Sequence, residues 1–344
     1  MLVPMFGFRL VLLLTTAGWA CAQSASQSAS DAATLVEEAA TLARSGKSWR
    51  AEGSLVTRGA DGKDQPAVSF KIAFLVPRYA RLEIAGGEAP LLRICEGSAQ
   101  WTYYPSLQGF VRVLLPQIGP CAFPVNAWPP LSNTLQSPVL AGTETVTVNG
   151  QPRACQVVRG AFTWPGRDPG VKEIVTLCID RQSLHILRYQ LQHLAPGEPS
   201  TRTYTFAAIE FNPELPSNLF DFQAPEGSRA LATIDWLTPI PSASPGVYRV
   251  SDDVSAPILT EVMPPKYPAE AALLSGGNTV TLHVEIGPDG IPHNVQVARS
   301  LGAGLDEEAV KCVKRWRFQP GMSAAGPIAV AATVLVHFMD PVHR

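Results

Sequence analysis

The sequence predicts an α+β fold in two parts: a leading helix with a large curved antiparallel half-barrel, then a small module of two helices and a three-stranded antiparallel sheet. Three observations support this fold class. Apolar residues recur at helical spacing over residues 31–46, strand-like runs separated by turn signals fill residues 49–212, and residues 269–338 follow the order helix, strand, strand, helix, strand. Because helices do not alternate with the strands of the first part, a parallel α/β sheet is not expected.

The leading helix is expected over residues 31–46. Leu35, Ala39 and Leu42 form an apolar stripe on one face, and Gly46 ends the helix. A helix with a single apolar stripe needs a surface to cover, and the strands that follow can supply it.

Strand-like runs rich in β-branched and aromatic residues follow this helix. The clearest are residues 70–76, 79–84, 99–104, 110–115, 144–148, 154–158, 173–179, 185–191 and 203–211. Asn149-Gly150 is a hairpin signal, and residues 180–183 are expected to turn the chain between the next pair. We assign residues 31–228 to this β domain.

Residues 229–246 change in character and are interpreted as a proline-rich linker. Pro239, Pro241 and Pro245 are incompatible with a regular ladder or helix, so the domain boundary is placed here. The C-terminal domain is then expected over residues 247–340.

The C-terminal domain is well punctuated. Residues 264–268 form an extended, proline-stiffened lead-in, and residues 269–275 a short helix. Residues 279–286 and 291–298 alternate apolar and polar around a turn, which predicts a hairpin. A second helix begins at Leu305, and a last strand is expected over residues 328–338.

The charges of this second helix have a structural explanation. Asp306, Glu307 and Glu308 crowd its first turn and the cations its last turn, as the helix dipole favours. A nucleic-acid-binding helix would need its cations on one exposed face of a basic domain, whereas the whole chain has a net charge of −2. We therefore expect no nucleic-acid partner, and we do not favour a membrane-surface helix.

The N-terminus is typical of an export signal. Arg9 precedes an apolar stretch, and Ala20-Cys21-Ala22 fits a cleavage site, so residues 1–22 are assigned to a cleaved signal peptide. An uncleaved anchor and lipidation at Cys21 are the less favoured alternatives. Export to an oxidising compartment permits disulfides.

The cysteines give disulfide candidates and no metal site. Cys155 and Cys178 lie in successive strand-like runs, and Cys95 and Cys121 are the remaining pair of that region, although four cysteines allow three connectivities. Cys312 is expected to be a buried apolar filler rather than a reactive thiol. No nucleophile, nucleotide-binding or metal-binding motif is present, so we expect no enzyme activity, cofactor or metal.

Several spaced residues make residues 247–338 resemble the C-terminal domain of the TonB family of periplasmic energy transducers. They are Tyr267-Pro268 with Ala271, Asp289-Gly290, Ser300, Gly302, Leu305-Asp306 with Ala309, Trp316-x-Phe318-x-Pro320, and Gly326-Pro327. The chain departs from the family's transducers in offering a cleavable signal and a β-rich domain where they have an anchor and a proline-rich spacer.

The resemblance implies a periplasmic protein that binds the TonB box, an extended peptide of an outer-membrane transporter, by adding it to the edge of the sheet. Carried over, the partner-binding residues would be Tyr267, Pro268, Ile328, Val330, Ala332, Val334, Val336 and Phe338. The same edge strand could serve a homodimer.

The first part resembles the LolA-like family of periplasmic lipoprotein carriers. The resemblance rests on the leading helix and on residues 96–105, 179–180, 212–213 and 219–227. It implies a half-barrel whose concave face holds acyl chains, which would be lined by Phe70, Phe74, Trp101, Tyr103 and Phe206. The alternative function is therefore a carrier or sensor of lipid or lipoprotein, and the plainer interpretation of these aromatics is sheet core.

Overall fold

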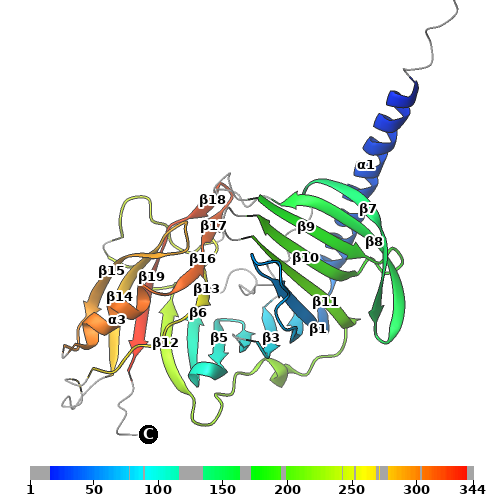
Figure 1. Cartoon of the computed structure of the whole chain (residues 1–344). Coiled ribbons are helices and arrows are strands. Elements are labelled where there is room, and N and C mark those ends of the chain that lie inside the picture. Colours follow the sequence, from blue (N-terminus) through cyan, green and yellow to red (C-terminus); the bar gives the residue numbers. More distant parts are fainter. Residues whose placement is uncertain are drawn as a thin grey trace, which may run out of the picture.

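The computed structural model describes residues 16–338 except 77, 88–89, 116–134, 163–171, 195–198, 242, 252, 269–270, 272–277 and 303. The described chain is mostly β with few helices (Figure 1). Its helices are α1 (Thr16–Ser45) and α3 (Leu305–Val313), with short 3-10 turns η1 (Pro105–Leu107) and η2 (Ser217–Phe220).

The strands are distributed along the whole chain. Those of the first part are β1 (Ser48–Arg58), β2 (Val68–Leu75), β3 (Tyr79–Ala85), β4 (Leu91–Glu96), β5 (Ala99–Tyr104), β6 (Gly109–Leu114), β7 (Leu135–Val148), β8 (Gln151–Phe162), β9 (Lys172–Ile179), β10 (Ile186–Leu194) and β11 (Ser200–Phe211). The later ones are β12 (Arg229–Asp235), β13 (Ile258–Glu261), β14 (Thr279–Ile286), β15 (Pro292–Arg299), β16 (Arg317–Gln319), β17 (Gly321–Ser323), β18 (Gly326–Ile328) and β19 (Val330–His337).

One 15-stranded sheet runs through both parts of the molecule. Its order is β15-β14-β19-β12-β6-β5-β4-β3-β2-β1-β11-β10-β9-β8-β7, and its pairs are antiparallel except for β6 with β12. Two small ribbons, β13 with β16 and β17 with β18, complete the described strands. The expected C-terminal strands are therefore not a separate sheet, because β12 joins β19 to the N-terminal strands.

The expected strands form, and most of their ends differ from the expected ones by a few residues. The exceptions are β7, which begins at Leu135 and not at residue 144, and the last expected strand, which is divided between β18 and β19. The hairpin between β7 and β8 turns at Asn149 (φ 53°) and Gly150 (φ 72°), so both turn residues adopt the left-handed region that this tight turn requires. The leading helix is longer than expected, since α1 begins at Thr16. The helix expected over residues 269–275 lies outside the described residues, apart from Ala271.

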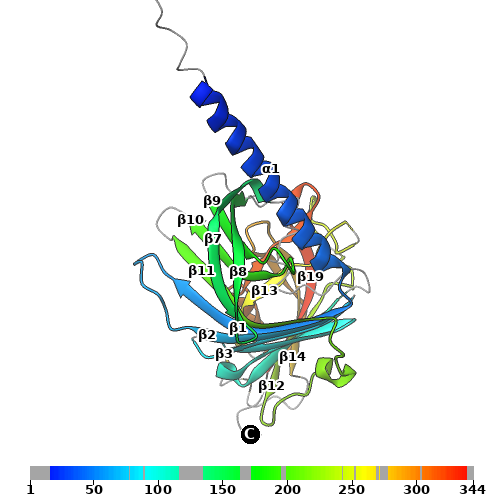
Figure 2. The same ribbon diagram turned by 90° about the vertical axis from the view of Figure 1, so that its right-hand side faces the viewer.

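The inner face of the sheet is covered by two different layers. Over β7 to β11 the cover is α1, whose buried apolar stripe includes Leu35, Val36 and Ala39 and packs on a cluster with Val175 and Leu177. Figure 2 shows α1 lying against this half of the sheet and extending beyond it. The apolar stripe of the helix therefore covers part of the concave surface that the strands create.

Over the rest of the inner face the cover comes from the C-terminal residues. One hydrophobic cluster contains Phe70 and Phe206 of the N-terminal strands together with Leu259 of β13, Trp316 and Phe318. The ribbon of β13 and β16 thus packs into the curve of the sheet, as Figure 1 shows. The two parts of the chain share one core.

The interpretation of residues 229–246 as a linker has to be corrected for its first part, because Arg229–Asp235 form β12 in the middle of the sheet. The three prolines that suggested a linker all lie after this strand. Residues 16–338, where described, contain no helix with the length and apolarity that a membrane crossing needs.

Candidate functional site

The strand expected to bind a partner is β19, and its side chains are core. Val330, Ala332, Val334 and Val336 alternate onto the inner face and are at most 1% exposed. Phe338, directly after the strand, is also buried. Ile328 belongs to β18 and pairs with Gly321. These side chains hold the strand in place, so only the backbone of β19 could take part in pairing.

Both backbone edges of β19 are occupied. On one side it pairs with β14 over eight successive residues without a register shift. On the other side β12 pairs antiparallel with it, through Ala232↔Val336, Thr233↔Leu335, Ile234↔Val334 and Asp235↔Thr333. Beyond the end of β12, the Ala331 N–H donates to the Tyr248 carbonyl (3.0 Å). The unpaired edge expected from the sequence is therefore covered by the chain itself.

A small polar cluster marks the junction of β12, β19 and β14. Nε2 of His337 lies 3.1 Å from the Thr233 hydroxyl, and Nδ1 lies 3.0 Å from the Thr279 hydroxyl. Burial lowers the pKa of His337 below its ordinary value, so the neutral ring is favoured there. The cluster thus fixes β12 to β19 by a side-chain contact as well as by the ladder.

Tyr267 and Pro268, which the resemblance assigned to partner binding, make contacts within their own segment and with the core. The Tyr267 hydroxyl donates to the Ala271 carbonyl (3.1 Å), and the half-buried Tyr267 ring packs on the shared core beside Pro268. Just upstream, the Met263 carbonyl accepts the indole N–H of Trp316 (2.9 Å) and the thiol of Cys312 (2.8 Å). This segment is therefore anchored against α3.

Two motifs of the C-terminal domain meet in space. The Phe318 N–H donates to the Gly290 carbonyl (2.9 Å), which links the Asp289-Gly290 turn to the Trp316-x-Phe318 run. Gly290 has φ 75°, and a Cβ there would lie 1.9 Å from the Phe318 carbonyl oxygen, so only glycine fits. This close approach explains why these motifs occur together.

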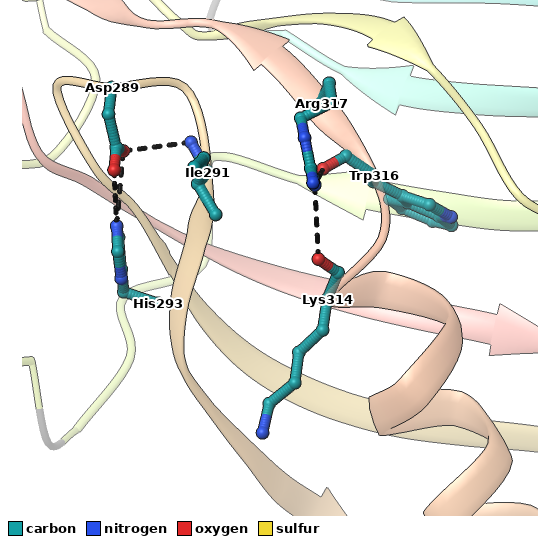
Figure 3. A network of polar contacts seen from close by, with 6 residues as sticks. All are labelled: Asp289, Ile291, His293, Lys314, Trp316 and Arg317. Atoms are coloured by element: carbon teal, nitrogen blue, oxygen red, sulfur yellow. Dashed lines mark hydrogen bonds and ion pairs between the residues drawn. The ribbon is translucent and has the colours of Figure 1, made fainter.

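Polar contacts hold both sides of this junction (Figure 3). Asp289 accepts the Ile291 N–H (3.0 Å) and lies 2.9 Å from Nε2 of His293, whereas Arg317 donates to the Trp316 carbonyl (2.7 Å). Burial raises the pKa of Asp289, but the Ile291 N–H and His293 outweigh it, so the net pKa is lowered.

The two terminal strands of the sheet are poorly suited to receive another strand. The β15 pairing with β14 contains two register shifts, and Asn294 in β15 has φ 45°. In β7, two register shifts accompany Ser137 (φ 48°) and Gly142 (φ 114°). Such bulges are a common protection of exposed edges, whereas β19 is regular throughout.

A shallow cleft of about 550 Å³ lies beside β15. Its lining residues are Val297, Asp306, Glu307, Val310, Lys311, Lys314 and Arg315. Asp306 is engaged locally, because it accepts the backbone N–H of Leu301 (2.9 Å) and the hydroxyl of Ser300. Lys311 in α3 and Lys314 and Arg315 just after it are exposed, whereas Trp316 lies in the core.

The five aromatics expected to line a lipid cavity do not share one face. Strand register places Phe70, Phe74 and Phe206 on the inner face, where Phe70 and Phe206 pack edge to face at 5.4 Å. Trp101 and Tyr103 lie on the opposite face, because their strand neighbour Thr102 points inward opposite Val111. The Trp101 ring stacks on Phe222 at 4.9 Å there. A single cavity lined by all five is not formed.

A buried arginine connects the inner face to the C-terminal part. The Arg93 side chain donates from Nε to the Thr102 hydroxyl (3.0 Å) and from Nη2 to the Leu259 carbonyl (3.2 Å). Burial lowers the pKa of the Arg93 guanidinium. Sequence reasoning missed this residue, because its partner Leu259 is 166 residues away.

The cysteines follow the expectations where they can be observed. Cys155 and Cys178 form a disulfide with a Cα–Cα distance of 5.4 Å. Cys95 is disulfide-bonded, and Cys121 lies outside the described residues. Cys312 is a buried free thiol, and burial raises its pKa to about 12. Within the described chain, no group of three or more His, Cys, Asp or Glu side chains could hold a metal ion.

Comparison with known proteins supports the C-terminal resemblance. Residues 263–339 match the family model described as Gram-negative bacterial TonB protein C-terminal. The chain is 46% identical over 57 residues to Protein tonB2 of Pseudomonas aeruginosa, which covers 16% of this chain and 21% of that protein. It is 36% identical over 63 residues to Protein TonB of Escherichia coli, covering 18% and 26%. The chain thus spans about a quarter of the length of these relatives.

Solved structures that align with part of the chain include a LolA-like protein. A LolA superfamily protein from Nitrosomonas europaea aligns with a TM-score of 0.27 and 13% identity over 56% of this chain and 97% of that one. MucB aligns with a TM-score of 0.36 and 16% identity over 67% and 72% of the two chains. Likeness at this level carries no inference about function.

Proposed function

We propose that the C-terminal part of this chain binds an extended peptide of an outer-membrane transporter through the β12-facing backbone edge of β19, in support of transport, in the periplasm. The observation that carries the proposal is that this edge accepts an antiparallel strand from outside the matched residues 263–339, namely β12. An edge that pairs with one added strand has the geometry to pair with a peptide in its place. Main-chain hydrogen bonds would supply affinity for a peptide of suitable pattern.

The regularity of β19 supports the choice of this edge. Its inward side chains are fixed in the core and its pairing with β14 has no register shift, so the backbone N–H and C=O groups that face β12 are held in a regular row. The bulged edges at β15 and β7 lack such a row. A homodimer through the same edge would need the same pairing groups and would exclude the peptide.

Site-specific photo-crosslinking tests the proposal. A photoreactive phenylalanine analogue at Leu335, which lies directly opposite Thr233 of β12, is expected to crosslink a labelled TonB-box peptide that takes the place of that strand. The matched control carries the same analogue at Val297 on β15, which is 41% exposed. Crosslinking from Val297 and none from Leu335 would contradict the proposed edge.

The alternative function, a carrier or sensor of acyl lipid or lipoprotein, gains no separate support from the described inner face. That face is filled by α1 and by the ribbon of β13 and β16. Mass spectrometry of lipid extracted from the purified protein tests it, since stoichiometric co-isolated acyl lipid would favour the carrier.

A further inference from the structure

Strand β12 pairs with two strands that come from different parts of the chain. It pairs antiparallel with β19 of the C-terminal part and parallel with β6 of the N-terminal part. Figure 1 shows β12 between these two strands. Resting on the proposed function, we infer that β12 is a built-in occupant of the β19 edge, so that a partner peptide binds by exchange with β12 and not by addition to a free edge.

The pairing of β12 is short enough to exchange. It contacts β19 through four residue pairs, whereas β14 holds β19 through eight. Its pairing with β6 is interrupted by a register shift between Ala230 and Ala232. Because β12 has fewer ladder pairs with β19 than β14 has, β12 is the neighbour of β19 that separates first.

The side chains of β12 indicate which class of peptide can replace it. Ala232 and Ile234 point to the inner face and are each 1% exposed, opposite Val336 and Val334. Thr233 points to the other face and reaches His337. The exchanging peptide is therefore extended, with apolar residues at two alternate positions, the first of them small, and a hydroxyl between them.

Exchange would also act on the N-terminal part. β12 is the strand that makes the 15-stranded sheet continuous between β6 and β19. When β12 leaves β19, the main-chain ladder between the two parts is lost. Among the described residues, the two parts then stay in contact through the shared core and the Arg93–Leu259 hydrogen bond. Peptide binding at one end of the sheet is thereby coupled to the contact between the two parts.

A reversible lock tests the inference in the full chain. Thr233 and Leu335 lie directly opposite each other. Opposite residues of an antiparallel pair have Cα atoms about 4.5–5.5 Å apart, which is within the range that a disulfide accepts. In the double variant Thr233→Cys/Leu335→Cys, the oxidised protein should bind a fluorescent TonB-box peptide at least about ten-fold more weakly than the wild type. Dithiothreitol should restore the affinity, as measured by fluorescence anisotropy.

The matched control joins the same residue to its other neighbour. In Thr281→Cys/Leu335→Cys the disulfide ties β19 to β14, so oxidation should leave the peptide affinity unchanged. Dithiothreitol acts on the native disulfides of both double variants alike, so any effect of reducing them appears in the control as well. Equal binding by the wild type and both oxidised variants overturns the inference and leaves the proposed function standing. No binding by any of the three proteins overturns both.

Peptide competition tests the sequence class. An unlabelled peptide with the sequence of residues 229–235 should displace the labelled TonB-box peptide from the wild type, and the same peptide with aspartate in place of Ile234 should not. Equal displacement by the two peptides would contradict the assigned inward position.

Discussion

The hydroxyl of Thr233 in β12 lies 3.1 Å from Nε2 of His337 in β19, across 104 residues of sequence. The contact joins a strand outside the matched C-terminal residues to the strand that carries the candidate edge. Under the proposed exchange, a peptide that binds this edge would have to break this contact as it replaces β12.

Acidification should weaken this junction. Burial lowers the pKa of His337 from its ordinary value of about 6.5, so the folded protein binds fewer protons than the unfolded chain over the interval between these two pKa values. Stability is therefore full above about pH 6.5 and falls as pH decreases towards the folded pKa. Urea unfolding at pH 7.5 and pH 5 should show a smaller pH dependence for His337→Gln than for the wild type.

His185, whose pKa is also lowered by burial, is present in both proteins and contributes equally to their pH dependence. A pH dependence that is identical in the wild type and His337→Gln would contradict the assigned state of His337.

The turn at Gly290 should not tolerate a side chain. Gly290→Ala places a methyl group against the Phe318 carbonyl at a residue with φ 75°, and we expect a loss of more than about 2 kcal/mol in the free energy of unfolding. Gly302→Ala is the matched control, because that glycine has φ 73° with open space around its Cβ position. Equal losses in the two variants would show that backbone conformation alone, and not the close approach, sets the requirement.

The free thiol should be inert in the folded protein. Burial raises the pKa of Cys312 to about 12, and its thiol donates to the Met263 carbonyl, so almost no thiolate is present at pH 8. Iodoacetamide should label Cys312 only after unfolding in urea, as followed by mass spectrometry. Rapid labelling of the native protein would contradict the buried position.

The disulfide of the β8–β9 pair should contribute to stability. Cys155 and Cys178 are 23 residues apart, and a crosslink that closes a loop of this size contributes about 3 kcal/mol. The variant Cys155→Ser/Cys178→Ser should lose that amount in equilibrium unfolding without a change in far-UV circular dichroism. Unfolding midpoints that coincide for the variant and the oxidised wild type would contradict this contribution.

The sequence predicted well what depends on local pattern. The alternation of residues such as 173–179 and 203–211 placed their strands, and the apolar stripe of Leu35 and Ala39 placed the C-terminal half of α1, which packs on the sheet. Each signal is contained in one segment, so it requires no knowledge of the partner strand.

The errors concern relations between distant segments. β12 was missed because it is only seven residues long and directly precedes the prolines, and because its partners, β6 and β19, are far away in sequence. The free edge of β19 was expected because a sequence does not show what covers a strand. Trp101 was grouped with Phe70 because the face that each side chain occupies depends on strand register.

Hydrogen–deuterium exchange of the full chain, measured with and without a saturating TonB-box peptide, distinguishes exchange of β12 from addition of the peptide elsewhere. If β12 is exchanged, peptide binding increases deuterium uptake in residues 229–235, while the amides of β19 stay protected because the peptide replaces β12 on the same backbone groups. New protection in β15 with unchanged uptake in β12 would contradict this replacement.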